Sequence, residues 1–119
     1  MDFIDKQPIY MQIADYFCEN ILTGKWKENE KIPSVREIAV LMEVNPNTAI
    51  RAYTFLQDKD IIYNKRGIGY FVAENGYARV LEMKKAEFTN KELPGIFKTM
   101  NLLNFKLDDL IRIYKKHIS

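Results

Sequence analysis

The chain has 119 residues, enough for one compact unit or for one small domain with an appendage, and its content of 47% hydrophobic and 29% charged residues is ordinary for a soluble globular protein. No apolar run approaches the ~20 residues that span a bilayer, and the start lacks the pattern of a signal peptide, so we expect a cytoplasmic protein without membrane contact. The chain has one histidine and one cysteine, and its sequence shows no His/Cys cluster at the spacing of metal ligands. We therefore expect neither an enzyme nor a metal site nor a cofactor.

The placement of charge is more informative than the formal net charge of +2. The first 76 residues carry nine Lys and Arg against eleven Asp and Glu, so this part is slightly acidic. Between residues 44 and 57, however, the only charged side chain is Arg51, and between residues 61 and 73 the only ones are Lys65 and Arg66. Acid-free surfaces with so few cations would bind a polyanion modestly per subunit, which favours a dimer that doubles the contacts.

A first helix is expected to open at Pro8, where a missing amide proton costs little, and to end at Gly24. Its apolar stripe consists of Ile9, Ile13, Ala14, Phe17 and Ile21. Cys18 is expected to be a buried small side chain. Trp26, in the loop that follows the helix, is expected to fold onto the core.

Residues 33–59 predict two short helices joined by a turn. Ser34 and Glu37 have the spacing of a capping box, and Asn45 followed by Pro46 is a second helix start. The second helix directs an apolar side inward. Its outer side consists of Asn47, Thr48, Arg51 and Thr54. A helix-turn-helix that places its second helix in a DNA major groove requires such a helix, with an apolar side in the core and a polar side facing outward.

Two short β-type runs follow, at residues 61–63 and 70–72, on either side of the cationic loop N-K-R-G-I-G. They predict a β-hairpin, and a hairpin after a helix-turn-helix is the layout of a winged helix-turn-helix. The wing would bring Lys65 and Arg66 to phosphates or into a minor groove. An adaptor that uses the same surfaces for a protein partner is the alternative, but acid-free polar faces favour DNA.

Residues 77–119 hold nine Lys and Arg against five Asp and Glu and show helical periodicity. Thr89 and Glu92 have the spacing of another capping box. Pro94 predicts that the helix breaks or bends between Phe88 and this proline. A last helix has acidic residues at its start and basic residues at its end, which complements the helix dipole.

The apolar faces of these tail helices are too wide to be buried against one another alone. We therefore expect the tails of two chains to pair in a two-fold homodimer, the alternative being a tail that packs back on its own domain. The residues expected in the dimer interface are Leu81, Phe88, Leu93, Ile96, Phe97, Met100, Leu103, Leu107, Leu110, Ile111 and Tyr114. No polar constellation identifies a site for a small-molecule effector.

Together these elements predict a mainly α-helical fold with a small β-hairpin, in which residues 1–74 form a winged helix-turn-helix and residues 75–119 a helical dimerisation tail. Residues 8–72 resemble the DNA-binding domain of the GntR family of bacterial transcription regulators. The resemblance rests on P-I-Y, G-K-W-K-E-N-E-K-I-P-S-V-R-E-I-A, V-N-P-N-T-A-I-R-A-Y and G-I-G-Y-F-V. The third string and the short tail are similar to the YtrA-type subfamily. This implies a repressor that binds double-stranded DNA at an inverted repeat as a homodimer.

The resemblance also implies roles for individual residues. The expected DNA-contacting residues are Ser34, Arg36, Asn45, Asn47, Thr48, Arg51, Tyr53, Lys65, Arg66, Gly67 and Gly69. Ser34 and Arg36 would hold phosphates, Asn47 would pair with adenine, and Arg51 would meet guanine or phosphate. Tyr53 would either reach a phosphate with its hydroxyl group or be half buried.

The sequence departs from the wider family in the recognition helix. Most GntR-type helices carry one arginine early in the helix and another directly before the position of Arg51, where this chain has Pro46 and Ile50. YtrA-type members share this departure. The operator sequence therefore cannot be transferred from the wider family.

Overall fold

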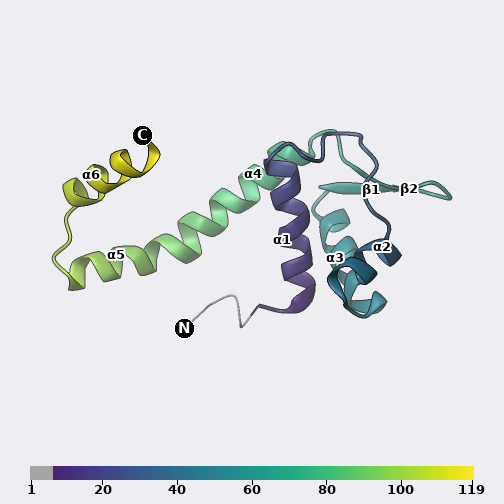
Figure 1. The fold of residues 1–119 in the computed structure, drawn as a ribbon, viewed down its shortest axis with the longest axis horizontal. Helices are drawn as coiled ribbons and strands as arrows, with labels where there is room; N and C mark the ends of the chain where they lie inside the picture. The colour runs from purple at the N-terminus through teal and green to yellow at the C-terminus, as the bar shows by residue number, and fades with distance from the viewer. Residues whose placement is uncertain (1–6) are drawn as a thin grey trace. The chain divides into compact units, whose positions relative to one another are not determined.

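A computed structural model describes residues 7–119, and its mainly helical architecture with one antiparallel hairpin confirms the predicted fold class (Figure 1). The elements are α1 (Ile9–Leu22), α2 (Val35–Met42), α3 (Pro46–Asp58), β1 (Ile62–Lys65), β2 (Gly69–Val72), α4 (Gly76–Glu87), the π-helical turn η2 (Phe88–Glu92), α5 (Leu93–Leu102) and α6 (Leu107–Ile118). None of the helices in this described part of the chain combines the length and apolar character needed to cross a membrane.

The chain divides into two compact units, one ending at Glu82 and the other spanning Met83–Ser119. The predicted boundary lies between residues 74 and 75, and the first unit extends beyond it. The first turns of α4 belong to the first unit because Val80 is completely buried there. Gly76 is buried as well, and a Cβ atom at this position would lie 2.9 Å from the carbonyl oxygen of Ile61. The composition changes after residue 76, but the packing changes only later, within α4.

The core of the first unit forms where α1 and α2 pack on α3. The ring of Phe17 on α1 packs edge-on against Tyr53 on α3, with a centroid separation of 5.0 Å, and against Trp26 at the same separation. Trp26 thus folds onto the core as expected, and Cys18 is buried as expected. The other buried core side chains include Ile13, Ala14, Ile21, Ile38, Ala49, Ala52, Leu56, Ile61 and Val72.

Both predicted caps of the helix-turn-helix are present. The hydroxyl oxygen of Ser34 accepts a hydrogen bond from the Glu37 amide at 3.1 Å, and the Glu37 carboxylate accepts one from the Ser34 amide at 2.8 Å. The side-chain oxygen of Asn45 accepts from the Asn47 amide at 2.7 Å at the start of α3. Between the helices, Glu43 adopts the left-handed conformation with φ of 54° and ends α2. These local bonds fix where α3 begins.

The wing is a hairpin in which Ile62 pairs with Val72 and Lys65 with Gly69. It projects from the helices of its own unit in Figure 1. Residues 29–32 run along the other edge of β2: the Ile32 amide donates to the carbonyl oxygen of Tyr70 at 2.9 Å, and Lys31 forms a bridge with Phe71. The wing is therefore anchored to the segment that leads directly into α2.

The second unit begins within α4, and this helix continues through the π-helical turn η2 into α5. We predicted that the helix breaks or bends between Phe88 and Pro94; α4, η2 and α5 follow one another without a loop, and the π-helical turn η2 lies in this segment (Figure 1). A proline inside an α-helix clashes with the carbonyl group four residues earlier, and the π-helical turn widens the helix there. The capping box predicted for Thr89 and Glu92 is wrong, because η2 and α5 have no side-chain cap.

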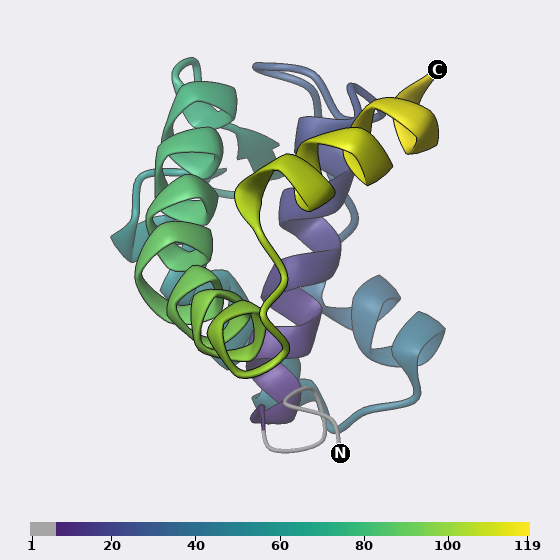
Figure 2. The same ribbon diagram turned by 90° about the vertical axis from the view of Figure 1, so that its left-hand side faces the viewer.

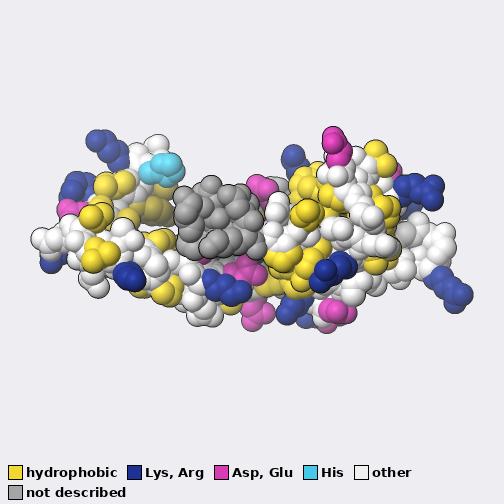
Figure 3. Space-filling model, turned by 90° about the horizontal axis from the view of Figure 1, so that it is seen from below, with side chains coloured by type: hydrophobic (Ala, Val, Ile, Leu, Met, Phe, Trp, Pro, Cys, Tyr) yellow, Lys and Arg dark blue, Asp and Glu magenta, His cyan; other side chains and the backbone are white. Residues whose placement is uncertain are grey.

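The apolar side chains of the second unit lie at the surface of the single chain. No residue between Met83 and Ser119 is buried, and α6 turns away after residues 103–106 instead of continuing the line of α5 (Figure 2). Large exposed side chains include Ile96, Phe97, Leu103, Leu107, Ile111, Tyr114 and Ile118. Figure 3 shows hydrophobic side chains at the surface of this unit among scattered Lys and Arg.

Candidate nucleic-acid interface

The amino-terminal half of α3 presents a polar surface without acidic side chains. Asn45, Asn47 and Arg51 are exposed and Thr48 is half-buried, whereas Ala49 points into the core. Because the side-chain oxygen of Asn45 caps the helix, only its amide nitrogen is left to donate to a ligand. Asn47 has both an amide oxygen and an amide nitrogen, the pair of groups that recognises adenine in a major groove.

Arg51 lies against an aromatic ring from another helix. Its guanidinium carbon is 4.2 Å from the centroid of the Tyr10 ring, and Tyr10 is a half-buried residue of the first turn of α1. Sequence reasoning assigned no role to Tyr10, although it ends the P-I-Y motif. No local spacing could have paired two residues so far apart along the chain.

Tyr53 does not belong to this surface, which corrects its predicted role. The residue is 1% exposed, and its hydroxyl group donates a hydrogen bond of 2.6 Å to the carbonyl oxygen of Pro33. Burial raises the pKa of the Tyr53 phenol far above its usual value, with smaller contributions from Tyr70 and Glu37. Tyr53 is thus a neutral core residue, and it cannot reach a phosphate.

The start of α2 offers a second polar group of residues. Ser34 and Arg36 are exposed, and the hydroxyl oxygen of Ser34 accepts the hydrogen bond that caps α2. The hydrogen bond that the Ser34 backbone amide donates, followed by the one from the Ser34 side chain, lowers the pKa of the Glu37 carboxyl group. The Glu37 carboxylate stays charged, but it is held at the backbone of the cap.

The wing carries the remaining predicted contacts. Lys65 and Arg66 are exposed, and the ammonium group of Lys65 lies 4.8 Å from the centroid of the Phe71 ring. The Ile68 amide donates to the Lys65 carbonyl oxygen and closes the tip, with Gly67 in the left-handed region at φ of 80°. A Cβ atom on Gly69 would lie 2.9 Å from the Lys31 side chain.

Lys31 is a further cation that sequence reasoning left in a surface loop. It is exposed, it lies beside Gly69 of the wing, and it is near enough to Glu37 to lower the pKa of that carboxyl group slightly. Lys31 thus connects strand β2 of the wing with the start of α2. Its pairing with β2 spans the whole helix-turn-helix in sequence, so spacing alone could not reveal it.

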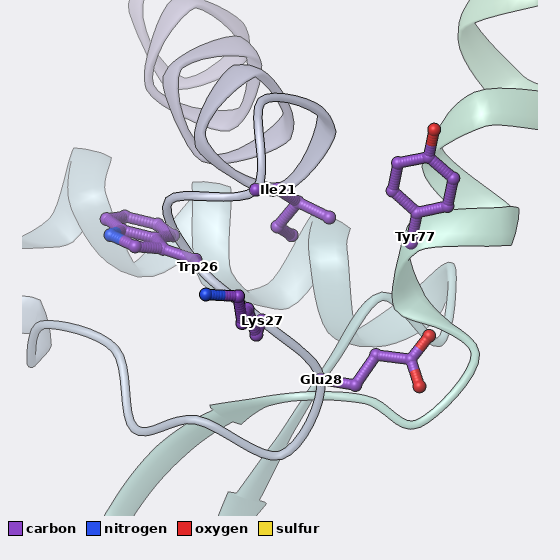
Figure 4. A pocket seen from close by; sticks show the side chains of 6 residues that line it. Ile21, Trp26, Lys27, Glu28 and Tyr77 are labelled. Carbon is purple, nitrogen blue, oxygen red and sulfur yellow. The ribbon is translucent and has the colours of Figure 1, made fainter.

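A shallow cavity of about 380 Å³ lies elsewhere on the first unit. It is lined by Ile21, Gly24, Trp26, Lys27, Glu28 and Tyr77. Figure 4 shows Trp26 and Tyr77 on opposite sides, with Ile21 between them. None of the predicted DNA-contacting residues lines it, and no cluster of metal-binding side chains occurs within residues 7–119.

Comparison with known proteins identifies the fold family. Residues 9–72, which include the helix-turn-helix and the wing, match the family model for bacterial regulatory proteins of the gntR family. The chain belongs to the GntR family. It is therefore a transcription regulator with a DNA-binding helix-turn-helix domain, and the prediction that it is not an enzyme agrees with this family.

Two relatives come from Bacillus subtilis strain 168. The regulator YhcF is 34% identical over 109 residues, which cover 92% of this chain and 88% of YhcF. The transcriptional repressor YtrA is 42% identical over 77 residues, which cover 65% of this chain and 59% of YtrA. The match to YtrA supports the predicted YtrA-type assignment.

Solved structures of similar proteins have the same fold. A GntR-family regulator from Bacteroides thetaiotaomicron is 40% identical with a TM-score of 0.77, and the match covers 92% of this chain and 96% of that one. The DNA-binding domain of AraR, solved in complex with the operator ORR3, is 30% identical with a TM-score of 0.53. That match covers 54% of this chain and 77% of the AraR domain.

Proposed function

We propose that this GntR regulator is a repressor that binds an inverted-repeat operator as a homodimer, with α3 in the major groove and the β1–β2 wing on the minor groove or the phosphate backbone. The AraR domain, which has the same fold, is bound to an operator in its solved structure. YtrA, the relative with 42% identity, is a repressor. Both observations support the proposal for this chain.

The polar start of α3 is the observation on which the proposal chiefly rests. Asn47 and Arg51 are exposed donors on a surface that has no acidic side chain between residues 44 and 57. Arginine pairs with guanine, and asparagine with adenine, through two hydrogen bonds each. On the wing, Lys65 and Arg66 supply charge without base information, which is the typical division between reading and positioning.

The dimer proposal rests on the tail. The apolar side chains of α5 and α6 are exposed, and several of them are more than half exposed, including Phe97, Leu103, Leu107 and Tyr114. Exposed apolar surface of this extent is typical of an interface between chains. A two-fold dimer formed by these helices would present two α3 helices to half-sites about one helical turn (~34 Å) apart or a multiple of it.

Selection of bound sequences from a random duplex pool tests the proposal most directly. We expect enrichment of one sequence in two inverted copies at a fixed spacing. Enrichment of a single half-site or of direct repeats would refute the two-fold arrangement. Failure of the full-length protein to bind any duplex would refute the function itself, and would favour the adaptor alternative.

Salt dependence and transcription complete the test. A titration of the selected duplex at several salt concentrations should give a linear fall of log affinity with log salt, because phosphate contacts release counterions. In a purified transcription assay with the selected site placed over a promoter, the protein should reduce transcript yield. Increased yield would identify an activator instead.

A further inference from the structure

The pair formed by Tyr10 and Arg51 connects a helix that does not enter DNA with the helix that does. Arg51 carries the only charge of α3 before Asp58, and its guanidinium carbon lies 4.2 Å from the centroid of the Tyr10 ring. α1 packs along α3 in the core, so Tyr10 is held in place by a rigid element. The contact is therefore part of the packed domain and does not depend on a mobile loop.

We propose that Tyr10 is a positioning residue that holds the Arg51 guanidinium in the orientation required for reading a base. The proposal rests on the proposed function, in which Arg51 meets DNA. A cation over an aromatic face is attracted by the ring electrons, and stacking restricts a side chain that otherwise has several rotatable bonds. The side chain of Arg51 would thus already be ordered before the protein binds the duplex.

Stacking and base reading use different parts of the guanidinium group. The Tyr10 ring attracts the cation through its π face, 4.2 Å from the guanidinium carbon, whereas the N–H donors lie in the guanidinium plane and point outward from its edge. That edge is the part that pairs with guanine or phosphate. A carboxylate partner would occupy the same donors and compete with DNA, and among residues 7–119 no such ion pair of Arg51 is formed.

Three variants test the role of the ring. Tyr10→Phe keeps the aromatic face, Tyr10→Leu removes it at similar volume, and Arg51→Ala removes the cation. We expect Tyr10→Leu to weaken binding to the selected operator about two- to fivefold per half-site, as a cation–π contact at an exposed site predicts. Tyr10→Phe should bind like the wild type. Tyr77→Leu, which changes an exposed tyrosine on α4, is the matched control and should have no effect.

The double variant, Tyr10→Leu with Arg51→Ala, distinguishes a positioning role of Tyr10 from a direct contact of Tyr10 with DNA. If the ring acts only through Arg51, Tyr10→Leu should have no further effect on affinity in the Arg51→Ala background, and selection with Tyr10→Leu should relax the preference at one base pair only. An equal loss in both backgrounds, or a loss with Tyr10→Phe, would show that Tyr10 contacts DNA itself and would overturn the proposal.

The free protein provides a readout that does not need DNA. The δ-methylene protons of Arg51 should show an upfield ring-current shift by NMR that disappears in Tyr10→Leu and persists in Tyr10→Phe. Random-coil shifts in the wild type would overturn the proposal without affecting the proposed function. A ring-current shift in a protein that binds no duplex would instead refute the proposed function, and the assigned role with it.

Discussion

The hydroxyl group of Tyr53 donates a hydrogen bond of 2.6 Å to the carbonyl oxygen of Pro33, the residue before the cap of α2. This bond joins the middle of α3 to the start of α2 inside the core. It therefore helps to fix the angle between the two helices of the helix-turn-helix.

Tyr53→Phe should reduce stability without altering DNA contacts. The change removes the hydrogen bond to Pro33 but keeps the ring that packs against Phe17, so a loss of about 1 kcal/mol in unfolding free energy is expected. Denaturant unfolding measures this loss, and operator affinity measured well below the unfolding transition should be unchanged. A large loss of affinity in the folded variant would restore Tyr53 as a DNA contact.

The same residue should make stability depend on alkaline pH. Burial raises the pKa of Tyr53 in the folded protein, whereas in the unfolded chain a tyrosine ionises near pH 10. The unfolded state therefore releases this proton first, so the stabilisation is complete below about pH 10 and is lost as the pH rises further. The difference in unfolding free energy between wild type and Tyr53→Phe should narrow above pH 10. A constant difference up to pH 11 would contradict this.

Gly76→Ala should destabilise the first unit. The added Cβ atom would lie 2.9 Å from the Ile61 carbonyl oxygen and 2.9 Å from a methyl group of Val72, and the backbone at Ile61 cannot move freely. Overpacking of this kind costs about 1–3 kcal/mol. Gly95→Ala in α5, where no atom lies within 4 Å of the added group, is the control for thermal unfolding and should show no loss.

Arg51→Ala and Arg66→Ala should weaken DNA binding in different ways. Loss of a base contact by Arg51 is expected to cost about 1–3 kcal/mol per half-site and to relax sequence preference at one position. Loss of a phosphate contact by Arg66 should weaken binding to all sequences and reduce the salt slope by about 1. Titrations with the selected operator and a scrambled duplex measure both effects. Equal, sequence-independent losses would remove the base-reading role of Arg51.

Ile96→Glu in α5 should break the proposed dimer. A charge placed in an apolar interface has no partner, and we expect the dimer dissociation constant to rise by at least about tenfold. Asn101→Glu changes charge equally on another face of α5 and is the control. Analytical ultracentrifugation measures the association. Unchanged association of Ile96→Glu would favour a tail without a role in pairing.

The sequence predicted the features that depend on neighbouring residues. Helix caps such as Ser34–Glu37 and Asn45 follow from spacings of two or three residues, and both are present. Tyr53 was misplaced, although its spacing of four residues from the buried Ala49 is a signal that could have assigned it to the core. That spacing places both residues on one face of α3.

Other features depend on contacts that no local pattern encodes. The roles of Tyr10 and Lys31 arise from residues brought together across the whole helix-turn-helix. Gly76 lies just after the predicted domain boundary, but its lack of a side chain is needed because it packs closely against the backbone of Ile61. At Pro94 the choice between a break and a widened turn depends on how the helix relieves a clash, and the sequence pattern is the same for both.

The pairing of residues 29–32 with β2 has a mechanical consequence. The Ile32 amide donates a hydrogen bond to the Tyr70 carbonyl oxygen of β2, and Ser34, the cap of α2, follows Ile32 by two residues. A displacement of the wing would therefore also displace the start of α2. The hairpin and the two helices should thus meet a duplex as one rigid body, with little ordering entropy to lose at the moment of contact. Any bending needed for a close fit would then fall on the DNA.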